Sequence, residues 1–132
     1  MYQLTTTFVT LFTLCLSVLA APLPSLDKRI THNGRGTWFF DGLGACGWES
    51  LNSDFIVAIS AQIYGSGGNC GQWVHVTNTA NNRSAYGLTV DECESCGADD
   101  LDMSPALFGK IGDLSTGVLS ISWNFMNKGW SP

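Results

Sequence analysis

Short runs of β-branched and aromatic residues recur along this chain, and clusters of glycine, asparagine, aspartate and serine separate them. The runs cover residues 36–41, 54–60, 72–77, 84–91 and 117–125. Their length and spacing predict an all-β barrel or sandwich. Residues 105–111 differ, because Ser104 is a suitable N-cap and Pro105 suits a first helical turn, so a short helix is expected there.

The N-terminus has the pattern of a secretory signal. Residues 8–21 carry no charge and are mostly apolar, and small residues precede a cleavage position after Ala20. This run is shorter than the roughly 20 apolar residues that a membrane-spanning helix needs. We therefore expect a signal peptide over residues 1–20 and a secreted, extracellular protein.

A dibasic pair, Lys28-Arg29, ends the short proline-containing stretch that follows. Kexin-type proteases cut such pairs in the late secretory pathway, which predicts a propeptide over residues 21–29; a solvated charged linker is the alternative. The signal and the dibasic site together suggest a fungal source. The remaining residues, 30–132, suffice for one small domain.

The expected domain is acidic, with four basic and ten acidic side chains and a formal charge of −6. Such a chain has no electrostatic footprint for nucleic acid or an anionic membrane. Neutral polymers, such as the polysaccharides that a secreted protein meets, remain open as partners. We expect a monomer that needs no cofactor.

Four cysteines lie in the expected domain: Cys46, Cys70, Cys93 and Cys96. In a small secreted domain they indicate two disulfides, and spacing alone allows three pairings. Zinc binding by the CESC sequence is a rival, disfavoured because a second CxxC is absent. Asp100 and Asp102 form a D-x-D pair that could bind calcium, but the spacing of a calcium loop is missing. We therefore expect no metal.

Alternation along the predicted strands separates inward from outward side chains. Trp123 shares a face with three other apolar residues of its run and is expected in the core. Trp73 and His75 lie opposite two valines. Trp73 is therefore a candidate binding aromatic, with packing under a loop as the alternative, and His75 is expected at the surface or in a hydrogen bond. Asn82 begins an N-glycosylation acceptor and predicts a surface loop.

Two aspartates are candidate catalytic or binding groups. Asp41 shares a predicted strand face with Thr37, so a hydroxyl and a carboxylate could line one groove, but Asp41 could equally start the turn at Gly42. Asp102 lies between two apolar residues, where partial burial would raise its pKa and suit a general acid. It could equally cap the helix that follows.

Five segments carry a family resemblance in the order GTWFFDGLGACGW, GGNCGQWVHVTN, TVDECESCG, DLDMSPALF and GVLSISWNF. Together they resemble the double-psi β-barrel domain of expansins, barwins and bacterial rare-lipoprotein-A-like proteins, most of all the small fungal expansin-like proteins called loosenins. The resemblance covers residues 36–126. It implies an all-β fold, a six-stranded double-psi β-barrel with one or two short helices and an open polysaccharide-binding groove. We expect a single such domain over residues 30–132, without a second, carbohydrate-binding domain.

The resemblance also implies roles for individual residues. Asp102 matches the family's essential acid, which corresponds to the general acid of family forty-five endoglucanases. Asp91 and Thr37 match a groove aspartate and a groove threonine. Asp41 has the spacing of the endoglucanase general base, although loosenins keep an acid here and are regarded as non-hydrolytic. Trp73, which is a candidate from strand alternation and not from the resemblance, completes the predicted polysaccharide-binding groove.

Related barrels imply a Cys46–Cys70 disulfide, which leaves Cys93–Cys96 as the second pair. The implied function is binding and loosening of cell-wall polysaccharide, such as cellulose, chitin or β-glucan, without hydrolysis. An inverting glycosidase or lytic enzyme, with Asp102 as acid and Asp41 as base, is one alternative. A protein-binding module, such as a protease inhibitor or a secreted effector, is another. Whether the protein is an enzyme is left open, with a non-hydrolytic role favoured.

Overall fold

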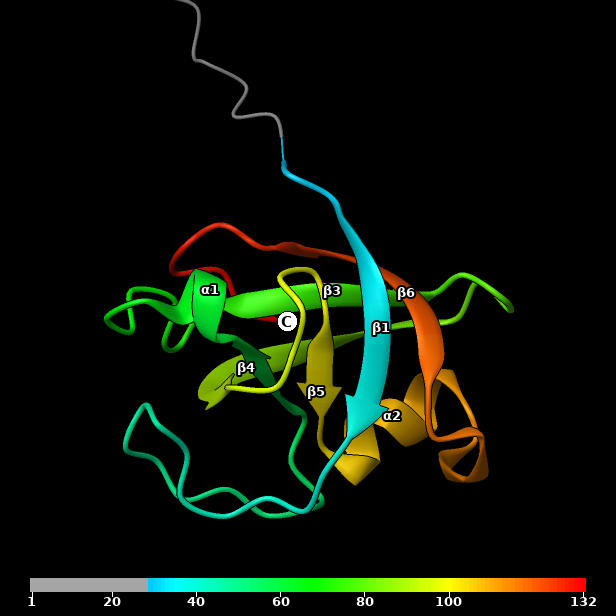
Figure 1. Cartoon of the computed structure of the whole chain (residues 1–132), viewed down its shortest axis with the longest axis horizontal. Helices are drawn as coiled ribbons and strands as arrows, with labels where there is room; N and C mark the ends of the chain where they lie inside the picture. Colours follow the sequence, from blue (N-terminus) through cyan, green and yellow to red (C-terminus); the bar gives the residue numbers. More distant parts are fainter. Residues whose placement is uncertain (1–28) are drawn as a thin grey trace, which may run out of the picture.

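The computed structural model describes residues 29–132, so the expected signal peptide and nearly all of the expected propeptide lie outside the described residues. Six strands form a closed barrel in the order β1–β5–β2–β4–β3–β6 (Figure 1). Their bounds are β1 (His32–Trp38), β2 (Ile56–Ser60), β3 (Trp73–Asn78), β4 (Ser84–Cys93), β5 (Leu101–Met103) and β6 (Leu119–Phe125). The pairs β1–β5 and β2–β4 are parallel and the other four are antiparallel. The predicted six-stranded barrel is therefore confirmed.

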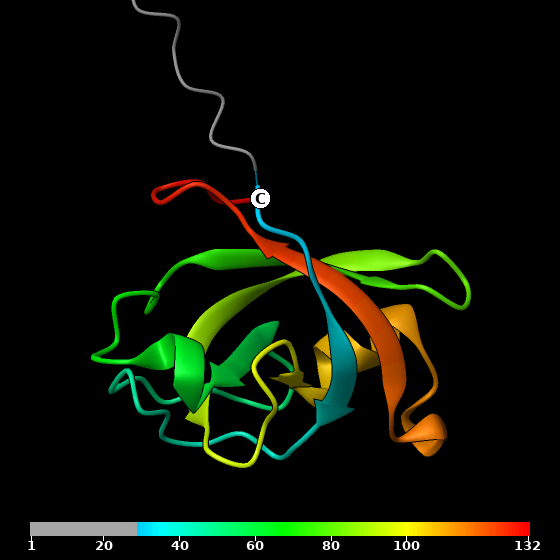
Figure 2. The same cartoon turned by 45° about the horizontal axis from the view of Figure 1, so that its top comes forward.

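Within residues 29–132, two short helices accompany the strands, α1 (Ala61–Tyr64) and α2 (Pro105–Ile111), together with a 3-10 turn, η1 (Leu114–Thr116). The expected helix over residues 105–111 is present, and α2 lies at one end of the barrel (Figure 2). Its apolar face joins the inward side chains of the strands in one core. Trp123 is 1% exposed and belongs to that core, as its alternation predicted. In the described residues, no helix is long and apolar enough to cross a membrane.

The strands differ from the predicted runs in two places. The strand expected over residues 36–41 begins at His32 and ends at Trp38. The chain turns away soon after, where the Asp41 N–H donates to Asn52 Oδ1 at 2.8 Å. No strand was predicted over residues 101–103, but they form β5, which fills the barrel wall between β1 and β2.

The connection between β1 and β2, residues 39–55, projects from the barrel wall as a long loop (Figure 1). A disulfide between Cys46 and Cys70 ties it to the segment before β3. Gly44 lies so close to β4 that a Cβ there would be 2.3 Å from the carbonyl oxygen of Val90. These contacts fix the middle of the loop against the outer face of β4.

Candidate functional site

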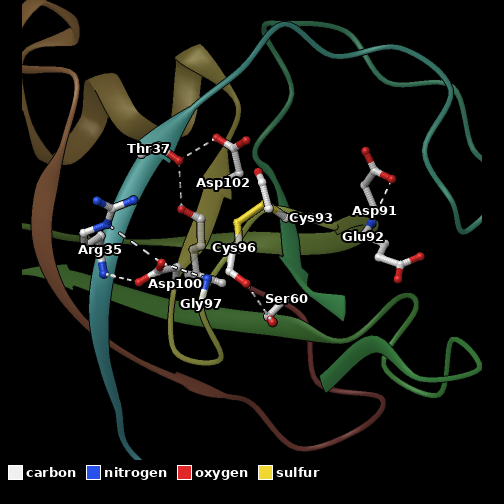
Figure 3. Close-up of a disulfide and its surroundings, with 12 residues drawn as sticks. Arg35, Thr37, Ser60, Asp91, Glu92, Cys93, Cys96, Gly97, Asp100 and Asp102 are labelled. Atoms are coloured by element: carbon white, nitrogen blue, oxygen red, sulfur yellow. Dashed lines mark hydrogen bonds and ion pairs between the residues drawn. A yellow bond between two sulfur atoms is a disulfide. The ribbon is translucent and has the colours of Figure 1, made fainter. Parts of the chain in front are cut away.

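Four residues on neighbouring strands stand in register across the barrel wall. Thr37 on β1 is paired with Asp102 on β5, Asp102 with Ala58 on β2, and Ala58 with Asp91 on β4. We call these four residues the cross-strand row. Neighbouring strands lie about 4.8 Å apart, so the Cα atoms of Asp102 and Asp91 are roughly 9.6 Å apart. Figure 3 shows both carboxyl groups pointing to the same side of the wall. Ala58, which is paired with both aspartates on the strand between theirs, has only a methyl group as its side chain.

Asp102 is half-buried and accepts a 2.9 Å hydrogen bond from Thr37 Oγ1. Burial raises the pKa of Asp102 above its ordinary value; hydrogen bonds from Thr37 and the Met103 backbone oppose this rise, and the negative charge of Asp91 adds to it. The carboxyl group can thus hold a proton more tightly than a free aspartate does. This is the property that a general acid, or a donor to a sugar oxygen, requires.

The helix cap that was weighed for Asp102 is supplied by another residue. Ser104 is fully buried, and its hydroxyl accepts a 3.2 Å hydrogen bond from the Leu107 N–H at the start of α2. The carboxyl group of Asp102 points instead to Thr37. It is therefore available to the outer face of the barrel.

Asp100 fastens the loop that precedes β5. Its carboxylate accepts hydrogen bonds from the backbone N–H groups of Arg35, at 2.8 Å, and Gly97, at 3.0 Å. A disulfide joins Cys93 and Cys96 in the same loop (Figure 3). The two cysteines of the CESC sequence are therefore not free to bind zinc. Nothing in the sequence of this loop distinguished Asp100 as its structural anchor.

Asp91 holds the long loop against β4. Its Oδ1 accepts hydrogen bonds of 2.8 Å from the N–H groups of both Ala45 and Glu92. Asp91 Oδ1 thus accepts two backbone hydrogen bonds. Asp91 Oδ2 accepts no hydrogen bond from the described residues. Asp91 therefore combines an anchoring role with a free acceptor in the cross-strand row.

Asp41 lies beyond the end of β1, and both of its carboxyl oxygens are buried without a hydrogen-bond partner among the described residues. Burial raises the pKa of Asp41 to about 6, and the negative charges of Asp54, Asp102 and Asp91 add to the rise. Asp41 is therefore near enough to Asp102 and Asp91 to respond to their charge. In this conformation its oxygens are covered by protein rather than open to a substrate.

Trp73 lies beside the cross-strand row in a separate hollow. It lines a pocket of about 350 Å³ between the outer barrel face and the long loop, together with Trp48 and Phe55. We call this hollow the Trp48 pocket. Trp73 is half-buried, so packing beneath a loop, the alternative weighed for it, accounts for part of its surface. Trp48 and Phe55, which sequence reasoning missed, are 45% and 40% exposed.

Two further sequence features have a place in the structure. Asn82 is exposed in the β3–β4 connection and has a φ of 62°, which asparagine tolerates better than most residues. His75 is partly buried and packs against the Tyr86 ring, with 4.8 Å between the ring centroids. Within residues 29–132, no group of three or more His, Cys, Asp or Glu side chains is arranged to hold a metal ion.

The chain matches no protein-family model, but individual proteins are similar to it in sequence. It is 29% identical over 115 residues to expansin-like protein 1 of Dictyostelium discoideum, covering 79% of this chain and 40% of that protein. It is 31% identical over 131 residues to the papain inhibitor of Streptomyces mobaraensis, covering 86% of this chain and 82% of the inhibitor. The chain spans 40% or less of the expansin-like relatives of Dictyostelium discoideum that lead these matches.

Solved structures share the fold. The expansin of Clavibacter michiganensis without ligand superimposes with a TM-score of 0.68 at 25% identity, covering 78% of this chain and 54% of the expansin. A variant of that expansin, solved in complex with cellohexaose, superimposes with a TM-score of 0.69 at 24% identity and the same coverage. Together with the closed six-stranded barrel and its two disulfides, these likenesses show that the chain belongs to the expansin/barwin-like family of double-psi β-barrel proteins.

Proposed function

We propose that this protein binds cell-wall polysaccharide along the cross-strand row and loosens it without hydrolysis. The observation that carries the proposal is the register of Thr37, Asp102 and Asp91 across four neighbouring strands. Four strands at about 4.8 Å spacing extend over roughly 14 Å, a length suited to a short stretch of sugar chain. The Thr37 hydroxyl and the two carboxyl groups offer donors and acceptors for sugar hydroxyls over that length.

Asp41 supports the non-hydrolytic part of the proposal. An inverting glycosidase needs a carboxylate that activates water on the face of the sugar opposite the acid. Both oxygens of Asp41 are buried, and its pKa of about 6 keeps it largely protonated in mildly acidic surroundings. An acid at Asp102 without a working base would cleave glycosidic bonds very slowly.

Relatives support the choice of ligand class. The family includes expansin-like proteins, and one expansin of the same fold has been solved with cellohexaose, a short cellulose chain. The two disulfides suit an oxidising, extracellular setting in which cell-wall polymers are present. Cellulose, chitin and β-glucan are the polymers to compare.

The test measures retention on each insoluble polymer and release of soluble sugar by mass spectrometry. Wild-type protein should be retained on at least one polymer and release no sugar above background. Asp102→Asn should be retained less, whereas Glu92→Gln, which removes a charge that points away from Asp91 in Figure 3, should behave as wild type. Sugar release that disappears in both Asp41→Asn and Asp102→Asn would make the protein a glycosidase instead.

A second candidate function is inhibition of a cysteine protease. The papain inhibitor of Streptomyces mobaraensis is 31% identical, and this chain covers 82% of it. The long loop also exposes three large apolar side chains, Phe40, Leu43 and Leu51, at 72%, 68% and 69%, and such side chains are available for contact with a protein partner. Titration against papain separates the two functions. Inhibition of papain that is weaker in Leu43→Ser and unchanged in Asp102→Asn would favour the inhibitor function.

A further inference from the structure

The Trp48 pocket has an aromatic lining and lies next to the cross-strand row. Its floor is formed by apolar side chains of the barrel face, Ile56, Leu88 and Val90, and Val90 directly precedes Asp91 of the row. Three rings, those of Trp48, Phe55 and Trp73, line the same hollow. A volume of about 350 Å³ lies within the range of roughly 300 to 1,000 Å³ usual for small-ligand sites.

The position of Trp48 is fixed by the chain around it. The Cys46–Cys70 disulfide lies two residues before Trp48. The Trp48 ring rests on Gly71, where a Cβ would be 3.3 Å from the nearest ring atom. The Gly44 N–H donates to the Trp48 carbonyl oxygen at 3.0 Å. The pocket is therefore built into the fold, and a ligand would bind without first ordering the loop.

Two carboxylates, Glu49 and Asp54, line the pocket beside its rings. Both residues are exposed, and neither forms an ion pair with a basic side chain of the described residues. Lys110 lies over the Phe55 ring, 5.8 Å from its centroid, but lines the neighbouring pocket and not this one. The Trp48 pocket therefore carries negative charge, and no basic side chain among its lining residues neutralises it.

We propose that the Trp48 pocket binds a protonated amino sugar, the glucosamine unit of partly deacetylated chitin. Aromatic rings accommodate the apolar face of a pyranose ring and attract an ammonium group, and Trp48 and Trp73 are among the residues that line the pocket. Glu49 and Asp54 supply the complementary charge, which a neutral glucose or N-acetylglucosamine unit cannot use. This inference rests on the proposed function, because the same sugar chain would continue from Val90 onto the row at Asp91.

The experiment compares binding of three oligosaccharides of equal length by calorimetry: glucosamine oligomer, N-acetylglucosamine oligomer and cellohexaose. At about pH 5.5, above the ordinary pKa of aspartate and glutamate side chains, the glucosamine oligomer should bind about tenfold more tightly than cellohexaose. Added salt should reduce that preference. Glu49→Gln with Asp54→Asn should abolish the preference, so that the glucosamine oligomer binds no more tightly than cellohexaose does to the same variant. Glu92→Gln removes one charge outside the pocket and should keep the preference.

Equal affinities for the three oligosaccharides would overturn the amino-sugar assignment and leave the proposed function standing. Failure of all three to bind would overturn both. If Glu92→Gln weakened the preference for the glucosamine oligomer as much as the single variant Glu49→Gln does, the preference would come from the net charge of the protein rather than from the pocket. Tight binding of an oligolysine peptide, lost in the double variant, would make the pocket a site for basic peptides and would overturn the assignment.

Discussion

Thr37 Oγ1 donates a 2.9 Å hydrogen bond to Asp102 Oδ1, and the two residues are direct partners in the parallel ladder between β1 and β5. The backbone pairing of β1 with β5 therefore determines that the Thr37 hydroxyl donates to the Asp102 carboxyl group. Residues 65 positions apart in the sequence are aligned by three paired positions of β1 and β5. The protonation of Asp102 depends on this contact, because the hydrogen bond lowers a pKa that burial raises.

Replacement of Thr37 by valine should raise the pKa of Asp102 further. Valine keeps the branched shape but removes the hydroxyl donor that favours the charged carboxylate. A carboxyl-carbon NMR titration of Asp102 measures the change directly. Thr77→Val, on β3, is the matched control and should leave the Asp102 titration where it is. An Asp102 pKa that is unchanged or lower in Thr37→Val would show that the contact does not stabilise the charged form.

Asp41 should make the fold less stable as the pH rises. Its pKa is about 6 in the folded chain, against about 3.9 in an unfolded one, so the folded state holds the proton more tightly. The stabilisation is complete below about pH 4 and is lost as the pH rises through about 6. Denaturant unfolding across this range should show that the free energy of unfolding falls by about 1 kcal/mol. This is less than the pKa difference alone implies, because solvent screens a residue that is only partly buried.

The Asp41→Asn variant is the test of that assignment, because an amide does not titrate. Its free energy of unfolding should fall less between about pH 4 and about pH 6 than that of the wild type, and what fall remains should come from Asp102, whose pKa burial also raises. Glu92→Gln should retain the wild-type profile. A fall of equal size in Asp41→Asn would mean that another carboxyl group, such as Asp102, causes the pH dependence.

The barrel was largely predictable from the sequence, since alternation of apolar residues is strong over residues 72–77 and 119–125. β5 was missed because three residues are too few for a pattern to stand out in a segment rich in acids. Its signal was nevertheless present: Leu101 and Met103 are fully buried on either side of the half-buried Asp102, an inward–outward–inward alternation.

The candidate site was less predictable than the fold. Thr37, Asp91 and Asp102 of the cross-strand row were named from family resemblance, but their alignment through Ala58 depends on pairing between strands distant in sequence. The burial of Asp41 depends on how residues 39–55 fold back, which no local periodicity records. Trp48 was missed for the same reason, because a loop aromatic has no pattern that indicates which surface it meets.

Gly44 should tolerate no side chain, whereas Gly42, in the same loop, should. A Cβ on Gly44 would be 2.3 Å from the Val90 carbonyl oxygen, while nothing lies within 4 Å of a Cβ on Gly42. Gly44→Ala should therefore lower the free energy of unfolding by about 1 to 3 kcal/mol, the usual cost of overpacking. Gly42→Ala should change it by less than about 0.5 kcal/mol. Similar values for the two variants, from urea denaturation, would show that the loop does not press on β4.

The two disulfides should differ in what they contribute to stability. Cys46 and Cys70 are 24 positions apart in the sequence, whereas Cys93 and Cys96 are 3 apart. A longer closed loop restricts the unfolded chain more, so loss of the first bridge should cost about 3.5 kcal/mol and loss of the second about 2 kcal/mol in the chain-entropy treatment. Paired cysteine-to-serine variants, compared by thermal and urea unfolding, measure both values.

The same variants separate anchoring of the long loop from anchoring of β5. Without the Cys46–Cys70 bridge, two hydrogen bonds would still tie the loop to β4: one from the Ala45 N–H to the Asp91 carboxylate and one from the N–H of residue 46 to the Val90 carbonyl oxygen. Amide exchange over residues 42–48 should then accelerate, while residues 101–103 stay protected. Without Cys93–Cys96, Asp100 still fastens the preceding loop through Arg35 and Gly97, so β5 should remain protected there too. Faster exchange of β5 in that second variant would mean that the disulfide, rather than Asp100, holds Asp102 opposite Thr37.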